Sequence, residues 1–147
     1  ALEQIKNIIS QSPVDITLLE NQLPYSVGVS DLAIVASGTA SLQTGLALTP
    51  LIIIYQVSSL TYWIARRLAK VQHIGMVNIL AGNEIVPELL QADFNPNRLA
   101  REAILLLKDQ ERRATMIGQL KDIRSQLGEP GAYHRAAQIL REYIQLH

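Results

Sequence analysis

The stretch that most constrains the fold runs from residue 32 to residue 43. Residues 32–36 are apolar and partly β-branched, and they stop at Ser37-Gly38-Thr39, after which residues 40–48 have the composition of a helix. This order predicts a strand, a tight turn and a helix. The first amides of a helix lack internal partners and lie at the positive end of its dipole, so the turn is a candidate site for a phosphate or diphosphate. The simpler interpretation is that Thr39 only caps the helix.

A second apolar run, residues 51–55, follows Pro50. Its unbroken apolar character is typical of a strand that is covered on both faces, as in a parallel sheet. The segment between the two runs is long enough for a crossover helix. Because ligands of open α/β sheets bind beyond the carboxyl ends of the strands, we predict an α/β domain with residues 37–39 and 55–59 on one rim of a parallel sheet.

Apolar periodicity and proline or glycine punctuation predict the other elements. The pattern predicts helices over residues 1–10, 58–70 and 84–91, a short helix ending near residue 30, and short strands over residues 14–19 and within residues 73–82. Three final helices are predicted to start at Asn95-Pro96-Asn97, to end at Gly128 and to follow Pro130-Gly131. Each of these three carries a one-sided apolar stripe, which needs a partner.

The composition excludes several classes of protein. The 147 residues suffice for one domain with a core, and the 13 basic and 13 acidic side chains cancel, unlike those of a general nucleic-acid binder. The absence of cysteine excludes disulfides, thiolate zinc sites and cysteine nucleophiles. The most apolar window, residues 46–55, is broken by Thr49-Pro50 and is too short to span a bilayer.

Catalytic motifs are sparse in this sequence. The chain has no Gly-x-Ser-x-Gly elbow, no Walker A loop and no dinucleotide fingerprint. Its histidines, His73, His134 and His147, are dispersed and lack the spacing of metal ligands. We therefore expect no metal and no cofactor.

Two carboxylates leave alternatives open. Glu84 and Glu88 are four residues apart at the start of the helix predicted over residues 84–91. They either interact favourably with the helix dipole or accept hydrogen bonds from sugar or ribose hydroxyls.

Aromatic and basic side chains meet in the helix predicted over residues 58–70. Tyr62 and Trp63 lie near its start, and Arg66 and Arg67 follow. This combination fits a helix that rests on an anionic membrane surface. The alternative is that Trp63 is a core or interface residue and that the cations form a solvated face.

Three ordered motifs resemble one family. They are ASGTASL at residues 36–42, LTYWIARRL at residues 60–68, and NILAG at residues 78–82 running on to VPELLQ at residues 86–91. Together they resemble the carboxyl-terminal part of lipid-A-disaccharide synthase, a GT-B fold glycosyltransferase of the lipopolysaccharide pathway. The match is continuous from about residue 30 to residue 91 and plausible through the helical tail.

The resemblance implies a transferase that joins UDP-2,3-diacylglucosamine to lipid X, forms lipid A disaccharide and releases UDP. It implies a Rossmann-like parallel sheet, part of a GT-B nucleotide-binding domain, followed by a helical C-terminal tail. The substrate or nucleotide contacts implied are Ser37, Gly38, Thr39, Gln43, Asn78, Glu88 and Gln91. Of these, Asn78 is the residue whose loss is expected to be most damaging, and the acyl chains of the substrates favour a membrane contact by Tyr62, Trp63, Arg66 and Arg67.

Four positions depart from the family pattern. The family usually has a glutamate at Gln43, an arginine at Gln56, a proline at Val77 and commonly an arginine at Asn83. Gln43 can still bond a hydroxyl without supplying a charge, and the loss of arginine at position 56 weakens any diphosphate contact. These departures favour an alternative function, a non-catalytic interaction or regulatory domain that has kept the fold but lost the donor site.

The resemblance also implies an organisation for the chain. Residues 1–92 form a partial UDP-sugar-binding region, and residues 93–147 form helices that pack on it within a single domain. The first strand and phosphate loop of the nucleotide domain, the acceptor-binding amino-terminal domain and its catalytic groups are expected outside this chain, so no transferase activity is expected from it alone. The last helix is expected to expose an apolar stripe that favours self-association, and the protein is expected at the cytoplasmic face of the inner membrane.

Overall fold

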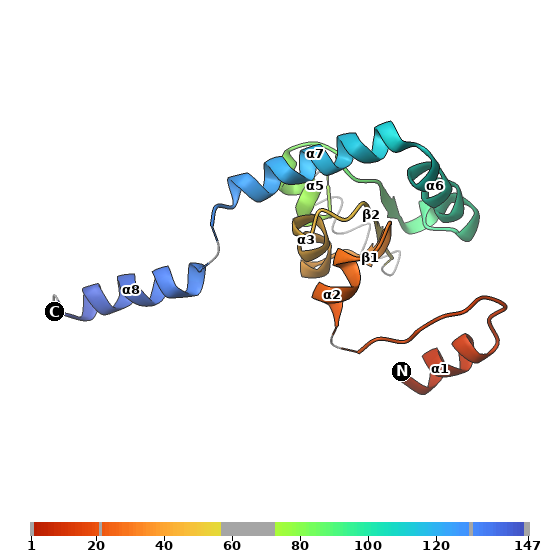
Figure 1. The fold of residues 1–147 in the computed structure, drawn as a ribbon, viewed down its shortest axis with the longest axis horizontal. Helices are drawn as coiled ribbons and strands as arrows, with labels where there is room; N and C mark the ends of the chain where they lie inside the picture. Colours follow the sequence, from red (N-terminus) through yellow and green to blue (C-terminus); the bar gives the residue numbers. More distant parts are fainter. Residues whose placement is uncertain (1, 21, 57–72, 130, 146–147) are drawn as a thin grey trace.

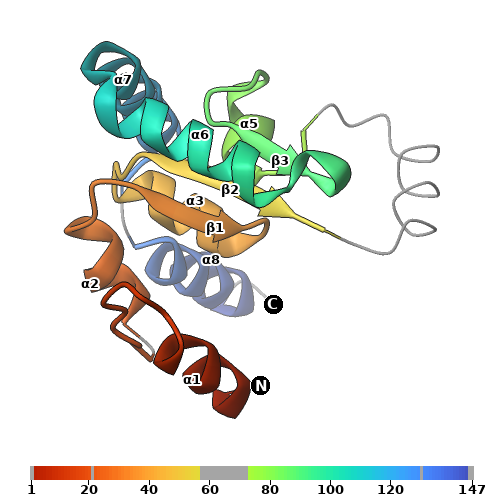
Figure 2. The ribbon, with the colours of Figure 1, turned by 90° about the vertical axis from the view of Figure 1, so that its right-hand side faces the viewer.

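The fold is built on a small parallel sheet, as seen in a computed structural model that describes residues 2–20, 22–56, 73–129 and 131–145. The strands lie in the order β1-β2-β3, and both neighbouring pairs are parallel. Helices α3 and α5 cover one face of the sheet and α6 covers the other (Figures 1 and 2). The strands are β1 (Ala33–Ala36), β2 (Leu51–Tyr55) and β3 (Glu88–Leu90).

The predicted strand, turn and helix over residues 32–48 are confirmed. Helix α3 (Thr39–Leu46) follows β1 directly and crosses over to β2, whose first three residues are fully buried. The pairing extends past the last residue of β1, because the Ser37 amide donates to the Ile54 carbonyl at 3.0 Å. The parallel α/β class is therefore correct, and the turn lies at the carboxyl edge of the sheet.

The hydrophobic core joins the sheet to helices from both sequence halves. Helix α7 (Gln110–Gln126) contacts α3, α5 and α6. Gly45 lies where three of these helices meet, since a Cβ at this position would be 3.1 Å from Val77 Cγ2 and 3.2 Å from Leu120 Cδ2. The core comprises Val35, Leu51, Ile52, Ile53, Val77, Ile85, Val86, Leu89, Leu106, Met116, Leu120 and Ile123.

The strand predicted over residues 14–19 is wrong. These residues form no strand and join no described sheet, and Val14, Ile16, Leu18 and Leu19 are exposed. An alternating apolar pattern becomes a strand only when a partner strand pairs with it, and the sheet of the described residues pairs only β1, β2 and β3.

Two predictions around Asn78 are also wrong. Residues 73–82 contain no described strand but a helix, α5 (Met76–Ala81), which ends at Gly82 in the left-handed conformation, φ 71°. The helix predicted over residues 84–91 is instead a loop, the strand β3 and the 3-10 turn η1 (Gln91–Asp93). The Glu-Leu-Leu segment of β3 has helical propensity, but its long-range pairing with β2 outweighs that preference. The favourable placement of two carboxylates at a helix start therefore does not exist over these residues.

The three predicted C-terminal helices are confirmed as α6 (Pro96–Lys108), α7 and α8 (Ala132–Gln145). Asn95 and Asp109 cap the first two, since their side chains accept hydrogen bonds from backbone amides at 3.0 and 2.9 Å. Helix α8 extends away from the sheet (Figure 1), and none of its described side chains is buried.

The amino-terminal helices are also as predicted. Helix α1 (Leu2–Ser10) buries no side chain, whereas α2 (Leu23–Gly28) contacts α3 and buries Val27. The helix predicted over residues 58–70 lies outside the described residues. Within the described part of the chain, no helix has the length and apolar character needed to cross a membrane.

Candidate functional site

The turn after β1 is open toward its outer side. Gly38 precedes the first residue of α3 and has φ 144°, a conformation that L side chains rarely adopt. Apart from Gly38 itself and its two chain neighbours, no described residue has an atom within 4 Å of the position that a Cβ of Gly38 would occupy. A phosphate could therefore approach the backbone closely at this point.

Thr39 does not cap the helix, contrary to the simpler interpretation of the motif. Thr39 is the first residue of α3 and is exposed, and the N-cap position before it is Gly38, which has no side chain and makes no capping hydrogen bond. The Ser41 hydroxyl does not cap the helix either, because it donates to the Gly38 carbonyl at 2.7 Å. The first amides of α3 are therefore not satisfied by a capping side chain from the described residues.

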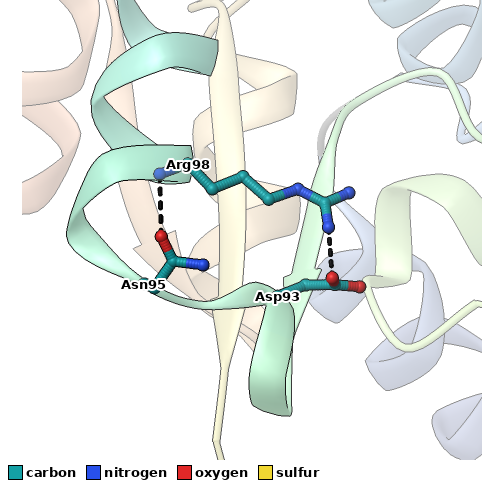
Figure 3. Close-up of polar contacts among 3 residues, drawn as sticks. All are labelled: Asp93, Asn95 and Arg98. Atoms are coloured by element: carbon teal, nitrogen blue, oxygen red, sulfur yellow. Dashed lines mark hydrogen bonds and ion pairs between the residues drawn. The ribbon is translucent and has the colours of Figure 1, made fainter.

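The carboxyl ends of the three strands bring further polar residues to this edge. Gln56 follows β2 and is exposed, and Gln91 follows β3 in a left-handed conformation, φ 51°. Figure 3 shows the contacts between the end of η1 and the start of α6. Asp93 pairs with Arg98, whose backbone amide donates to the side chain of Asn95. Gln43 lies further along α3 and is exposed.

Ser37 connects the turn to the segment that leads into α5. Its hydroxyl donates to the Ile74 carbonyl at 3.2 Å, across 37 positions of sequence. Ser37 is half-buried, and its amide already pairs with Ile54 of β2. The turn and the start of α5 are therefore held side by side.

Asn78 lies in the core rather than on the rim. It is fully buried, and its Oδ1 accepts hydrogen bonds from the amides of Ile85 and Val86 at 2.9 and 3.0 Å. Its Nδ2 donates to the Val86 carbonyl at 2.8 Å and to Glu88 Oε1 at 2.7 Å. These contacts use the whole side-chain amide, so Asn78 holds the loop before β3 in place.

Glu88 directs its carboxylate into the protein. Oε2 accepts from the Ile74 amide at 2.9 Å, and Oε1 accepts from the Gly75 amide at 3.0 Å as well as from Asn78. An anion that accepts backbone N–H groups at the start of a helix is favoured by its dipole. In this arrangement both oxygens of Glu88 are engaged by the protein.

Gly75 was not singled out by the sequence patterns, yet it completes this arrangement. A Cβ here would overlap Ile53 Cδ1 and lie 3.1 Å from Glu88 Oε1. Its backbone therefore packs directly on β2. A glycine immediately before an apolar segment could have indicated the start of a helix. The prediction of a strand over these residues excluded that interpretation.

Two further cavities lie elsewhere. One, of about 490 Å³, is lined by the loop of residues 84–87 and the start of α7; the other, of about 770 Å³, lies between residues 46–48 and the end of α7. Both loops precede their strands, so these cavities border the amino edge of the sheet. Among the described residues, no cluster of histidine and carboxylate side chains is arranged to hold a metal ion. Tyr62, Trp63, Arg66 and Arg67 lie outside the described residues.

Comparison with known proteins decides the family. A model of the lipid-A-disaccharide synthetase family matches residues 2–143, nearly the whole chain. The chain belongs to this family. The lipid-A-disaccharide synthase of Anaeromyxobacter dehalogenans (strain 2CP-1) is 46% identical over 125 residues, which cover 85% of this chain and 33% of the relative.

More distant members of the lipid-A-disaccharide synthetase family match over more of the chain. The synthase of Myxococcus xanthus is 42% identical over 142 residues, 97% of this chain and 37% of the relative. That of Coxiella burnetii is 33% identical over 144 residues, 98% of this chain and 38% of the relative. The chain thus spans little more than a third of the length of these curated relatives, and the resemblance inferred from its three motifs is confirmed.

Proposed function

We propose that this chain is the nucleotide-sugar-binding part of a glycosyltransferase that joins UDP-2,3-diacylglucosamine to lipid X. Membership of the lipid-A-disaccharide synthetase family supports this class of reaction. In this proposal the diphosphate lies against the turn at Ser37, Gly38 and Thr39, with Gln43 and Gln91 on the same side. Asn78 and Glu88 support the site from behind.

One observation carries the proposal. Gly38 immediately precedes α3 at the carboxyl edge of a parallel sheet, with open space at its Cβ position and no capping side chain from the described residues. Backbone amides at a helix start and a close backbone approach are what a diphosphate requires, and this edge is where α/β sheets bind their ligands. Neither of the two cavities described above, at the start and at the end of α7, offers this combination.

UDP titrated into the isotope-labelled chain and followed by amide chemical shifts tests the proposal. We expect shifts centred on residues 37–39 and 91, and weaker ones with uridine, which lacks the diphosphate. No shift at millimolar UDP, or shifts confined to the cavity at the start of α7, would contradict it.

A second function is favoured by specific residues. Gln43 stands where the family usually has a glutamate and Gln56 where it has an arginine, and both are exposed near the proposed site. A chain with these changes fits a non-catalytic interaction domain that keeps the fold. UDP release by the protein joined to the acceptor domain of a relative distinguishes the two functions, because a complete but inactive protein favours the second.

The catalytic groups are expected in the part of the family that this chain does not span. We therefore expect no sugar transfer from the chain alone and restoration by an added amino-terminal domain. Transfer by the chain alone would contradict this division of the site.

The lipid substrates favour a peripheral position at the cytoplasmic face of the inner membrane. Tyr62, Trp63, Arg66 and Arg67 are proposed as its contacts. Binding to vesicles that contain an anionic lipid, lost in a W63S/R67S variant and retained in a Q138S variant, supports this position. A wild-type chain that ignores such vesicles contradicts it.

A further inference from the structure

We infer that Glu88 is a positioning residue of the nucleotide site and acts on the turn at Gly38 through Ile74 and Ser37. This inference rests on the proposed function, because it concerns the same site. The family resemblance implied a direct contact of Glu88 with the ligand, whereas the sequence pattern alone left this open. The geometry points instead to an indirect role.

The carboxylate of Glu88 is oriented toward donors of the protein itself. Glu88 is half-buried, and its three hydrogen bonds, at 2.9, 3.0 and 2.7 Å, go to two backbone amides and to Asn78. A carboxylate already shared among three donors is poorly placed to accept bonds from a ribose as well.

The carboxylate of Glu88 fixes the backbone of the segment before α5. It bonds the amides of Ile74 and Gly75, and Gly75 has no room to move toward the sheet because Ile53 lies against it. The segment before α5 is therefore held from two sides. The Ile74 carbonyl lies in the same peptide group as the Gly75 amide, so both constraints act on the orientation of this carbonyl.

The segment before α5 is in turn bonded to the turn at Gly38. The Ile74 carbonyl accepts the hydroxyl of Ser37, which is adjacent to Gly38. Glu88 Oε2 and the Ser37 hydroxyl thus bond the same residue, one through its amide and the other through its carbonyl. A change at Glu88 reaches the turn by this route without touching the nucleotide.

The test is a double-mutant cycle with E88Q and S37A. A glutamine that keeps its oxygen at the Oε1 position preserves the bonds to Gly75 and Asn78 but turns an NH₂ group toward the Ile74 amide. E84Q is the matched control, because Glu84 is exposed and loses the same charge. UDP is the probe in every variant.

In the ligand-free chain, E88Q is expected to shift the amides of residues 37–39 and to speed exchange of the Ile74 amide, and E84Q to do neither. E88Q is expected to raise the Kd for UDP about tenfold, as for loss of one hydrogen bond to a charged group. In the S37A background it should have little further effect, because the route is already broken.

Two results would overturn the inference. One is an E88Q chain whose residues 37–39 keep their ligand-free shifts. The other is an E88Q effect on UDP affinity that is equal with and without S37A, since a general loss of stability predicts that outcome. If the wild-type chain does not bind UDP, the proposed function fails, and the ligand-free shifts still decide whether Glu88 positions the turn.

Discussion

At the scale of single residues, the polar interior is organised by Asn78. Its four hydrogen bonds connect α5, the loop before β3 and Glu88. The motif predicted that losing Asn78 would be damaging, but not why, because sequence spacing does not reveal which amides a buried side chain satisfies. The structure supplies a reason that involves no ligand.

The substitution N78A is expected to lower the free energy of unfolding by about 3 kcal/mol, because it leaves the amides of Ile85 and Val86 and the Val86 carbonyl without their partner. Urea unfolding measures the change. The exposed Asn83 provides the control, and N83A should change stability by less than about 0.5 kcal/mol. Equal effects of the two substitutions would contradict the structural role of Asn78.

At the scale of elements, the strong local sequence patterns were sufficient to predict helices and strands, whereas the weak patterns were not. The β1-α3-β2 unit and the three final helices followed from apolar periodicity, caps and glycines. Strand β3 did not, because three residues carry too little pattern and their conformation depends on pairing with β2. For the same reason, the segment at residues 14–19 has a strand pattern but no strand.

Helix packing at this scale can be tested with two helical glycines. G45A places a Cβ 3.1 Å from Val77 and is expected to destabilise by about 1 kcal/mol, because overpacking outweighs the gain in helix propensity. G118A meets nothing within 4 Å and is expected to stabilise by about 0.5–1 kcal/mol. Thermal unfolding compares them, and a stabilising G45A would show that α3, α5 and α7 are less tightly packed than described.

At the scale of the whole molecule, α8 is a long helix that buries none of its described side chains. Its apolar side chains Ile139, Leu140, Tyr143 and Ile144 are 62–73% exposed, and a stripe of this kind favours association. The exposed stripe was predicted from the sequence. What covers it was not, because a periodic pattern identifies a buried face and not the surface that buries it.

Self-association is therefore expected of the chain in solution. L140S/I144S should raise the dissociation constant at least about 100-fold, because each side chain contributes about 1.5–3 kcal/mol when buried. Q138S/R141S, on the polar face, should leave it unchanged. Sedimentation equilibrium measures both, and a wild-type chain that stays monomeric at millimolar concentration contradicts the expectation.

The central claim is that the turn at Gly38 binds a nucleoside diphosphate. Calorimetric titration of UDP into G38V and G128V tests it most directly, because both glycines have positive φ and open space around the Cβ position, but Gly128 lies at the far end of α7. We predict that G38V raises the Kd at least about tenfold while G128V leaves it unchanged. Equal affinity of the two variants for UDP would contradict the account.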